Sequence, residues 1–407
     1  MAQKGLCVTF LTVFAVAWMT QAGGQSKKKP AASEAKNAVV APSPYAPRFA
    51  FGGNAAEVPA TFNEDLVFFP VNINGSQPSL FVLDTTASET SIDPKRAQEL
   101  GLSPNQPDAL VLPGVTFPLS ALPAIGRADF SAATGRPYPG TIGNDLLSRA
   151  VVAIDYARET VRIFDPGSYK YTGTGSILPL SMRDGMPVIR ARFSTPKGKQ
   201  VEADFGIDTA LIAGVVISQK FSDAHHIFPK KGKSAQGFDP QLTGGENVSL
   251  FRLRYFKIGK SAADDPIAEL SSSKKAGTGD ATLAGVIGGR LLRRFNIVFD
   301  YPHKQIMFEA NENFGNYDEE DKSGIALIAS GPGLKTLEVA HVVPHSPAAD
   351  AGIQAGDVIE GIDGEAAADI SLASAREMFR QVGYKYKLLV QHGGQTKEVT
   401  IQTQRLL

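Results

Sequence analysis

Between residues 49 and 309, the hydrophobic positions fall mainly in short runs separated by Gly, Pro, Asn and Asp. Runs such as 66–71, 79–83 and 295–299 are rich in Val, Leu, Ile and Phe, and they have the length of strands. Helical patterns are few and short, as at 94–100. The pattern predicts a mainly β fold over this region.

The same region contains an internal repeat. Segment 142–147 reads IGNDLL and segment 287–292 reads IGGRLL. An Asp-Tyr pair follows each at the same distance from the glycine, since 155−143 and 300−288 are both 12. A strand-like run comes next in both copies. Matching order and spacing of this kind indicate a duplication.

Upstream of each copy, an Asp-Thr pair directly follows an apolar run. Residues 81–86 read FVLDTT and residues 205–210 read FGIDTA. With the repeated apolar-Ile-Gly element, these pairs make residues 60 to 310 resemble the retropepsin-like and pepsin-like aspartic proteases. That resemblance implies two acid-protease-like β lobes in one chain, at 49–170 and 171–313.

The resemblance also implies an active site shared by the two lobes. Asp84 and Asp208 would be the catalytic pair, because two neighbouring carboxylates can share a proton and act as acid and base in one step. The implied supporting residues of the two turns are Thr85, Thr209, Thr86 and Ala210.

Thr86 and Ala210 stand where the family has glycine, which often serves a left-handed backbone or a close approach. Three readings stay open at this point: a working endopeptidase that cleaves peptide bonds with an activated water, a protease-like scaffold that binds peptides without cleaving them, or an unrelated β protein whose aspartates are turn residues.

The C-terminal region has a different pattern. The run SPAADAGIQAGDVI at 346–359, followed by Ile362-Asp363-Gly364, resembles the bacterial PDZ domain. The predicted α+β domain spans 324–407, after an acidic linker at 314–323. PDZ domains bind extended peptides at a sheet edge beside a helix and capture the terminal carboxylate with backbone amides.

On that resemblance, the peptide would contact a carboxylate loop and one helix. The candidate residues are Gly324, Ile325, Ala326, Leu327, Leu372, Ala375 and Phe379. Plain core packing is the alternative for the apolar side chains of the helix, since the apolar positions of 372–380 recur at helical spacing.

Residues 1–22 read as a cleavable export signal: Lys4 precedes an apolar run that is too short to span a bilayer. Residues 23–48, rich in Lys, Ala, Ser and Pro, predict a flexible linker. The expected location is the periplasm or the extracellular space, with no stable membrane span after cleavage.

The single cysteine lies in the signal, which excludes a zinc–thiolate site from the mature chain. The formal net charge of zero argues against nucleic acid as a partner. No cofactor and no metal are expected. The predicted partners are a peptide or protein substrate and C-terminal peptides at the PDZ domain.

Overall fold

The computed structural model describes residues 43–103, 106, 108–126, 130–229, 234–241, 245–272 and 282–407. The predicted export signal and most of the predicted linker lie outside the described residues. Residues Ser43–Leu407 form one compact unit. Among the described residues, the structure contains no helix that is both long enough and apolar enough to cross a membrane.

The first lobe is built on an eight-stranded sheet and carries three short α-helices. In spatial order, the strands are β1 (Arg48–Phe49), β8 (Val115–Leu119), β7 (Asp108–Leu112), β4 (Leu66–Ile73), β5 (Ser79–Leu83), β9 (Gly140–Ile142) and β6 (Ser91–Ile92), with β3 (Thr61–Asn63) paired to β4. The helices are α1 (Pro94–Glu99), α2 (Ser131–Thr134) and α3 (Asn144–Leu147), and a 3₁₀ turn, η1, covers Ala50–Gly52.

The second lobe is built on a ten-stranded sheet. Its strands are β17 (Ala235–Asp239), β18 (Glu246–Arg252), β21 (Ile267–Ser271), β16 (Val215–Ser218), β22 (Leu283–Ile287), β15 (Gln200–Ile207), β14 (Met186–Ser194), β19 (Tyr255–Ile258) and β20 (Ser261–Asp264), with β13 (Ser181–Arg183) paired to β14. The described part of this lobe contains the helices α4 (Gln219–His225) and α5 (Gly289–Leu292).

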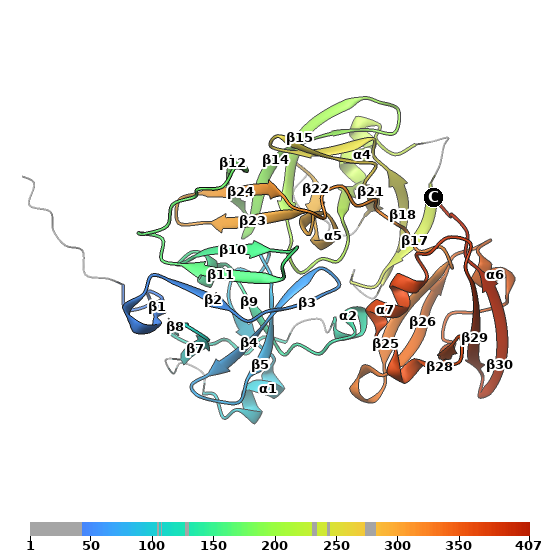
Figure 1. The fold of residues 1–407 in the computed structure, drawn as a ribbon, viewed down its shortest axis with the longest axis horizontal. Coiled ribbons are helices and arrows are strands. Elements are labelled where there is room, and N and C mark those ends of the chain that lie inside the picture. Colours follow the sequence, from blue (N-terminus) through green and yellow to red (C-terminus); the bar gives the residue numbers. More distant parts are fainter. Residues whose placement is uncertain are drawn as a thin grey trace, which may run out of the picture. The chain divides into compact units, whose positions relative to one another are not determined.

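A third sheet joins the lobes and shows their relation directly. Its order is β12 (Ser176–Pro179), β24 (Gln305–Ala310), β23 (Phe295–Asp300), β10 (Val151–Asp155), β11 (Thr160–Phe164) and β2 (Ala55–Val58). At its centre β10 and β23 run side by side, antiparallel (Figure 1). Ala153 pairs with Val298. These residues are equivalent in the repeat, since 298−153 equals 288−143, so a local twofold axis passes between them.

Both lobes repeat one strand arrangement around that axis. In the first lobe β9 lies between β5, to which it is parallel, and β6, to which it is antiparallel. In the second lobe β22 lies in the same way between β15 and β16. Every residue of β9 and of β22 is buried, so both central strands are covered on both faces. The predicted duplication is therefore visible as repeated topology.

The C-terminal domain has a six-stranded sheet and its own hydrophobic core. The strands are β25 (Ile325–Ser330), β26 (Thr336–Val342), β27 (Val358–Ile362), β29 (Lys385–His392) and β30 (Gln395–Gln402), with β28 (Glu365–Ala366) paired to β27. The helices are α6 (Pro347–Asp350) and α7 (Leu372–Met378), and η3 (Pro332–Leu334) and η4 (Ala367–Asp369) are 3₁₀ turns.

Local sequence explains much of this domain. In β29, buried and exposed residues alternate, as expected of a strand with one solvated face. Ser346 and Ser371 cap α6 and α7 by accepting backbone amide hydrogen bonds. Asp363 and Gly364 both have positive φ, 52° and 86°, which suits the predicted tight hairpin turn between β27 and β28. The mainly β fold class is confirmed.

The predicted acidic linker at 314–323 is not a solvated spacer. Asp318 and Glu320 are each 3% exposed and Lys322 is 1% exposed. Arg252 of the second lobe donates to Glu320 at 2.8 Å, and the carboxylate of Asp318 accepts the Ile267 amide at 3.0 Å. The segment is polar because its carboxylates hydrogen-bond to the lobe, a reason that composition alone does not reveal.

Candidate functional site

The two Asp-Thr turns have the same backbone anchors. Asp84 follows β5, and its amide donates to Ile142 O at 3.0 Å. Asp208 follows β15, and its amide donates to Ile287 O at 2.9 Å. The parallel pairing of β5 with β9, and of β15 with β22, thus continues into each turn. Both aspartates therefore stand at the end of a buried strand, at equivalent points of the two lobes.

Reciprocal hydrogen bonds join the two turns. Thr85 Oγ1 donates to Ile207 O at 2.7 Å and accepts from Thr209 N at 3.2 Å. Thr209 Oγ1 donates to Leu83 O at 2.7 Å and accepts from Thr85 N at 3.2 Å. Both threonines are fully buried. The interaction thus brings together two turns that lie 124 residues apart in the sequence.

The half-buried carboxylates are oriented by their own turns. Asp84 Oδ1 accepts from Thr86 N at 2.8 Å, from Thr86 Oγ1 at 2.6 Å and from Ala87 N at 3.1 Å. Asp208 Oδ1 accepts from Ala210 N at 2.8 Å. The Thr86 hydroxyl gives Asp84 a donor that an alanine side chain cannot give Asp208, so the two turns differ chemically.

The expected need for glycine at these positions is wrong for the backbone conformation. Neither Thr86 nor Ala210 has a positive φ. The side chains therefore cause no left-handed strain. Neighbouring backbone instead closely approaches Gly143 and Gly288, the glycines of the repeat. A Cβ on Gly143 would lie 2.6 Å from the Glu89 carbonyl carbon, and one on Gly288 would lie 2.3 Å from Ala213 O.

A cleft of about 1110 Å³ contains both aspartates. Thr86 and Ala210 also line it, together with Tyr138. Residues 137–141, which lead from α2 into β9, form part of its wall.

Two supporting residues were not found from the sequence. Gln241, 5% exposed, donates from Nε2 to Ala210 O at 2.8 Å and accepts the Ile212 amide at 2.6 Å. It braces the second turn. Burial raises the pKa of Tyr301, and the nearby charge of Asp84 raises it further. The repeated Asp-Tyr pair at 155–156 and 300–301 was the sequence signal that could have found Tyr301.

The predicted PDZ contacts divide into two groups. Gly324, with φ of 80°, precedes β25, and Ile325, Ala326 and Leu327 begin that strand at the edge of the sheet. The predicted helix contacts are Leu372 and Ala375 of α7 and Phe379, its C-cap, and they are 4%, 0% and 0% exposed. All three belong to the core of the domain.

Exposure therefore corrects part of the predicted groove. Ala375 and Phe379 pack inward and do not line an open surface, because their helical spacing points them at the sheet.

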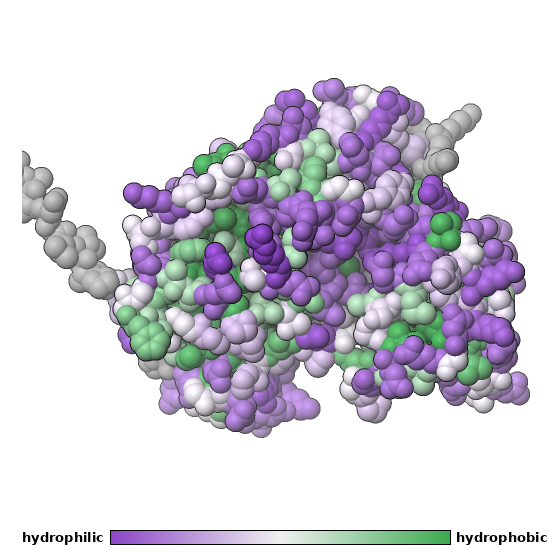
Figure 2. Space-filling model, in the orientation of Figure 1, coloured by the Kyte–Doolittle hydropathy of each residue, from purple (hydrophilic) through white to green (hydrophobic). Residues whose placement is uncertain are grey.

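Apolar residues on the visible face of the domain gather over the strands beside α7, among hydrophilic neighbours (Figure 2). Among the described residues, the structure contains no group of three or more His, Cys, Asp or Glu side chains that could hold a metal ion.

Comparison with known proteins identifies the C-terminal domain. The family model described as PDZ domain matches residues 338–402. No curated protein matches the chain. The chain is thus a mainly β protein with a C-terminal PDZ domain, a class of module that binds peptides.

Two solved structures are similar to this chain at low sequence identity. The photosystem II D1 C-terminal processing protease is 25% identical with a TM-score of 0.19, over 20% of this chain and 22% of its own. The aspartic proteinase from Irpex lacteus is 15% identical with a TM-score of 0.41, over 64% of this chain and 98% of its own. Both TM-scores lie below 0.5, so neither likeness establishes a shared fold or function.

Proposed function

We propose that the protein is an exported aspartic endopeptidase in which Asp84 and Asp208 activate a water molecule, with peptide binding at the PDZ domain. The observation that carries the proposal is the reciprocal hydrogen bonding of Thr85 and Thr209. It holds two Asp-Thr turns together at a cleft that both carboxylates line. The periplasm or the extracellular space remains the proposed location.

The proposed chemistry uses one proton shared by two carboxylates. The ionised aspartate takes a proton from the water as its oxygen attacks the scissile carbonyl carbon. The protonated aspartate gives its proton to the carbonyl oxygen, forming a neutral tetrahedral diol. As the carbon–nitrogen bond breaks, one diol proton passes to the aspartate that is now ionised, and the carboxylic acid formed from the other aspartate protonates the leaving nitrogen. The products are an acid and an amine, and the pair regains its starting charge.

The cleft suits an extended polypeptide in size. Its volume of about 1110 Å³ exceeds that of a typical small-ligand pocket. Apolar residues line it together with the carboxylates, including Leu80, Val82 and Val216. A substrate would therefore be held by side-chain burial and by polar groups at the reacting bond.

The test is cleavage of an unbiased peptide pool at mildly acid pH by the mature protein. Asp84→Asn and Asp208→Asn should each reduce the rate by at least about 10²–10⁴-fold, the usual contribution of a positioned acid or base. Asp155→Asn is the matched control: Asp155 caps the turn after β10 and does not line the cleft. Cleavage that persists in both dyad variants would refute the assignment.

A non-catalytic peptide-binding scaffold is the second candidate. The PDZ match at 338–402 favours peptide binding independently of the cleft. Ala210 also leaves the second turn without the hydroxyl that Thr86 supplies in the first. A pepstatin-like inhibitor separates the two candidates, because such compounds imitate the tetrahedral intermediate and inhibit only a working dyad.

A further inference from the structure

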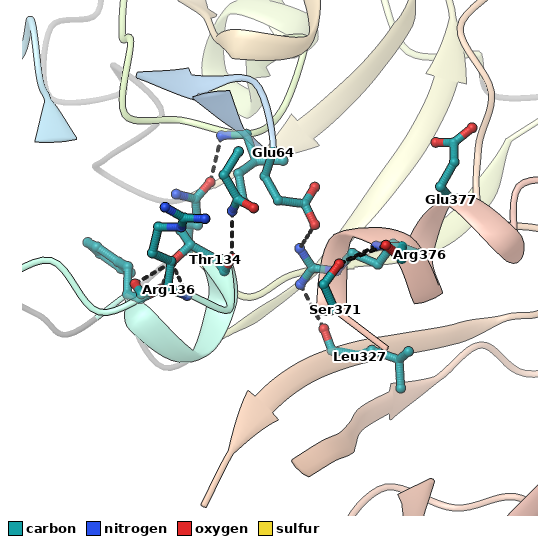
Figure 3. Close-up of polar contacts among 12 residues, drawn as sticks. Glu64, Thr134, Arg136, Leu327, Ser371, Arg376 and Glu377 are labelled. Atoms are coloured by element: carbon teal, nitrogen blue, oxygen red, sulfur yellow. Dashed lines mark hydrogen bonds and ion pairs between the residues drawn. The ribbon is translucent and has the colours of Figure 1, made fainter. Parts of the chain in front are cut away.

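The first lobe lies against the PDZ edge where a peptide would add. β25 pairs with β26 on one side and ends the sheet order on the other. PDZ-type recognition adds an extended chain to such an edge, beside a helix. Helix α2 of the first lobe packs against β25 (Figure 3). The same lobe reaches α7: Gly135, the left-handed cap of α2, lies so near Leu372 that an added Cβ would come within 2.9 Å of the Leu372 Cβ.

Arg376 of α7 connects the first lobe with β25. Arg376 donates from Nη1 to Glu64 Oε1 of the first lobe at 2.9 Å and from Nη2 to Leu327 O of β25 at 2.7 Å (Figure 3). The Arg376 and Glu64 side chains are 16% and 6% exposed. A charge pair this deeply buried is costly to break from one side only, because the remaining charge is left unpaired.

The Glu64 carboxylate thus occupies Arg376 in the way that the terminal carboxylate of a bound peptide would. Its carboxylate lies beside Gly324–Leu327, the predicted carboxylate loop, and both line a cavity of about 170 Å³. Arg380 lines the same cavity. A terminal carboxylate that displaced Glu64 would meet the Arg376 guanidinium, whereas Arg380 is already paired with Glu377 at 2.8 Å. Charge-assisted bonds to arginine are the strong interactions available to such a group.

The segment that covers the groove edge also borders the candidate active site. Phe130 and Ser131, at the start of α2, line the cleft that holds Asp84 and Asp208. Pro137 and Tyr138 line it a few residues later. Movement of α2 away from β25 would therefore displace part of the cleft wall.

We propose that the first lobe closes the PDZ groove within the same chain, and that a peptide bearing a free C-terminal carboxylate competes with Glu64 for Arg376, releases α2 and thereby alters the cleft. This rests on the proposed peptide binding at the PDZ domain. The binding-competent form is then only partly populated, which lowers the apparent peptide affinity by that fraction.

Binding to full-length mature protein tests the proposal. Fluorescence anisotropy is measured with a labelled pool of C-terminal peptides, in the Asp84→Asn background so that the peptides stay intact. Glu64→Gln keeps the side-chain shape and removes the charge. Peptide affinity should rise about tenfold, the difference between a charge-assisted and a neutral hydrogen bond. Glu57→Gln, at an exposed ion pair of the same lobe, should leave affinity unchanged.

A second variant uses an independent contact, in case Glu64→Gln folds poorly. Gly135→Asn tolerates the left-handed φ of 67° but places a side chain against Leu372. It should also raise peptide affinity. In the Asp84→Asn background without a further substitution, peptide binding should accelerate hydrogen exchange at residues 131–138, and amidating the peptide terminus should abolish that effect.

The outcomes are distinguishable. Tighter binding by both variants with faster exchange at 131–138 supports the closure. Binding that is equally tight in the wild type and both variants overturns the closure and leaves PDZ peptide binding intact. No binding by any variant overturns both. None of these results depends on hydrolysis, so failure of the dyad assignment would be seen separately in the aspartate variants.

Discussion

Removing the hydroxyl of Thr85 tests whether the two turns stabilise each other. Thr85→Val keeps the branched shape and deletes two buried hydrogen bonds, to Ile207 O at 2.7 Å and from Thr209 N at 3.2 Å. Each bond contributes about 1 kcal/mol, and each buried group left without a partner costs about 1–3 kcal/mol. Because the partners share the site and can relax, we expect a net loss of about 2–5 kcal/mol in unfolding free energy.

The equivalent substitution in the other turn should cost the same free energy, because the hydrogen bonds of the two turns are reciprocal. Thr209→Val deletes the equivalent bonds, to Leu83 O at 2.7 Å and from Thr85 N at 3.2 Å. Both threonines are 0% exposed. Equal geometry and equal burial predict that the two variants lose the same free energy to within about 1 kcal/mol. Each variant should also weaken the lobe opposite to the substitution, since every one of these bonds crosses between the lobes.

Urea unfolding followed by far-UV circular dichroism measures the loss, with the PDZ transition fitted separately because that domain has its own core. Tryptophan fluorescence is unsuitable, since the one tryptophan, Trp18, lies in the predicted signal. Thr85→Ser is the matched control: it keeps the hydroxyl and should cost about 1 kcal/mol for one lost methyl group. A loss below about 1 kcal/mol for Thr85→Val, or a difference above about 2 kcal/mol between the two valine variants, would refute the reasoning.

Two further predictions concern a buried carboxyl and a glycine. Burial raises the pKa of Glu269 to about 8, with the charge of Asp239 adding to the effect. The folded state therefore binds a proton that the unfolded state has released, and stability should fall as pH rises from about 4.5 to about 8. Glu269→Gln should remove that slope in thermal unfolding at pH 5 and pH 8; an unchanged slope contradicts the assignment. Gly288→Ala would place a Cβ 2.3 Å from Ala213 O, a backbone atom that cannot rotate away. It should cost about 3 kcal/mol or more in urea unfolding, against less than about 0.5 kcal/mol for Gly315→Ala, where open space surrounds the site. Equal losses at the two glycines would show that neighbouring backbone does not pack closely against Gly288.

The sequence by itself determined several strands, one hairpin turn and helix α7. The apolar runs before Asp84 and Asp208 became buried strands, and the turn at Asp363-Gly364 became a hairpin. Helix α7 formed where apolar residues recur at helical spacing, starting from the Ser371 cap. These features depend on neighbours within a few residues, so period, capping and turn chemistry suffice to predict them.

Tertiary structure decided which of these elements meet. The sequence indicated Thr85 and Thr209 as supporting residues of the turns only through a family resemblance. The hydrogen bonds themselves join residues 124 positions apart. The exposure of Phe379 and Ala375 depended on how α7 packs on its sheet, and the burial of Glu320 depended on Arg252 of another domain. Composition cannot reveal such partners.

The short apolar runs thus predicted a mainly β chain, and the matched segments 142–147 and 287–292 predicted its duplication. Only the folded chain placed Ala153 opposite Val298 across a local twofold axis and set α2 against β25. The physical reason is that strand formation follows from the local order of apolar and turn residues, whereas the choice of a distant partner depends on packing, burial and charge pairing summed over the whole unit.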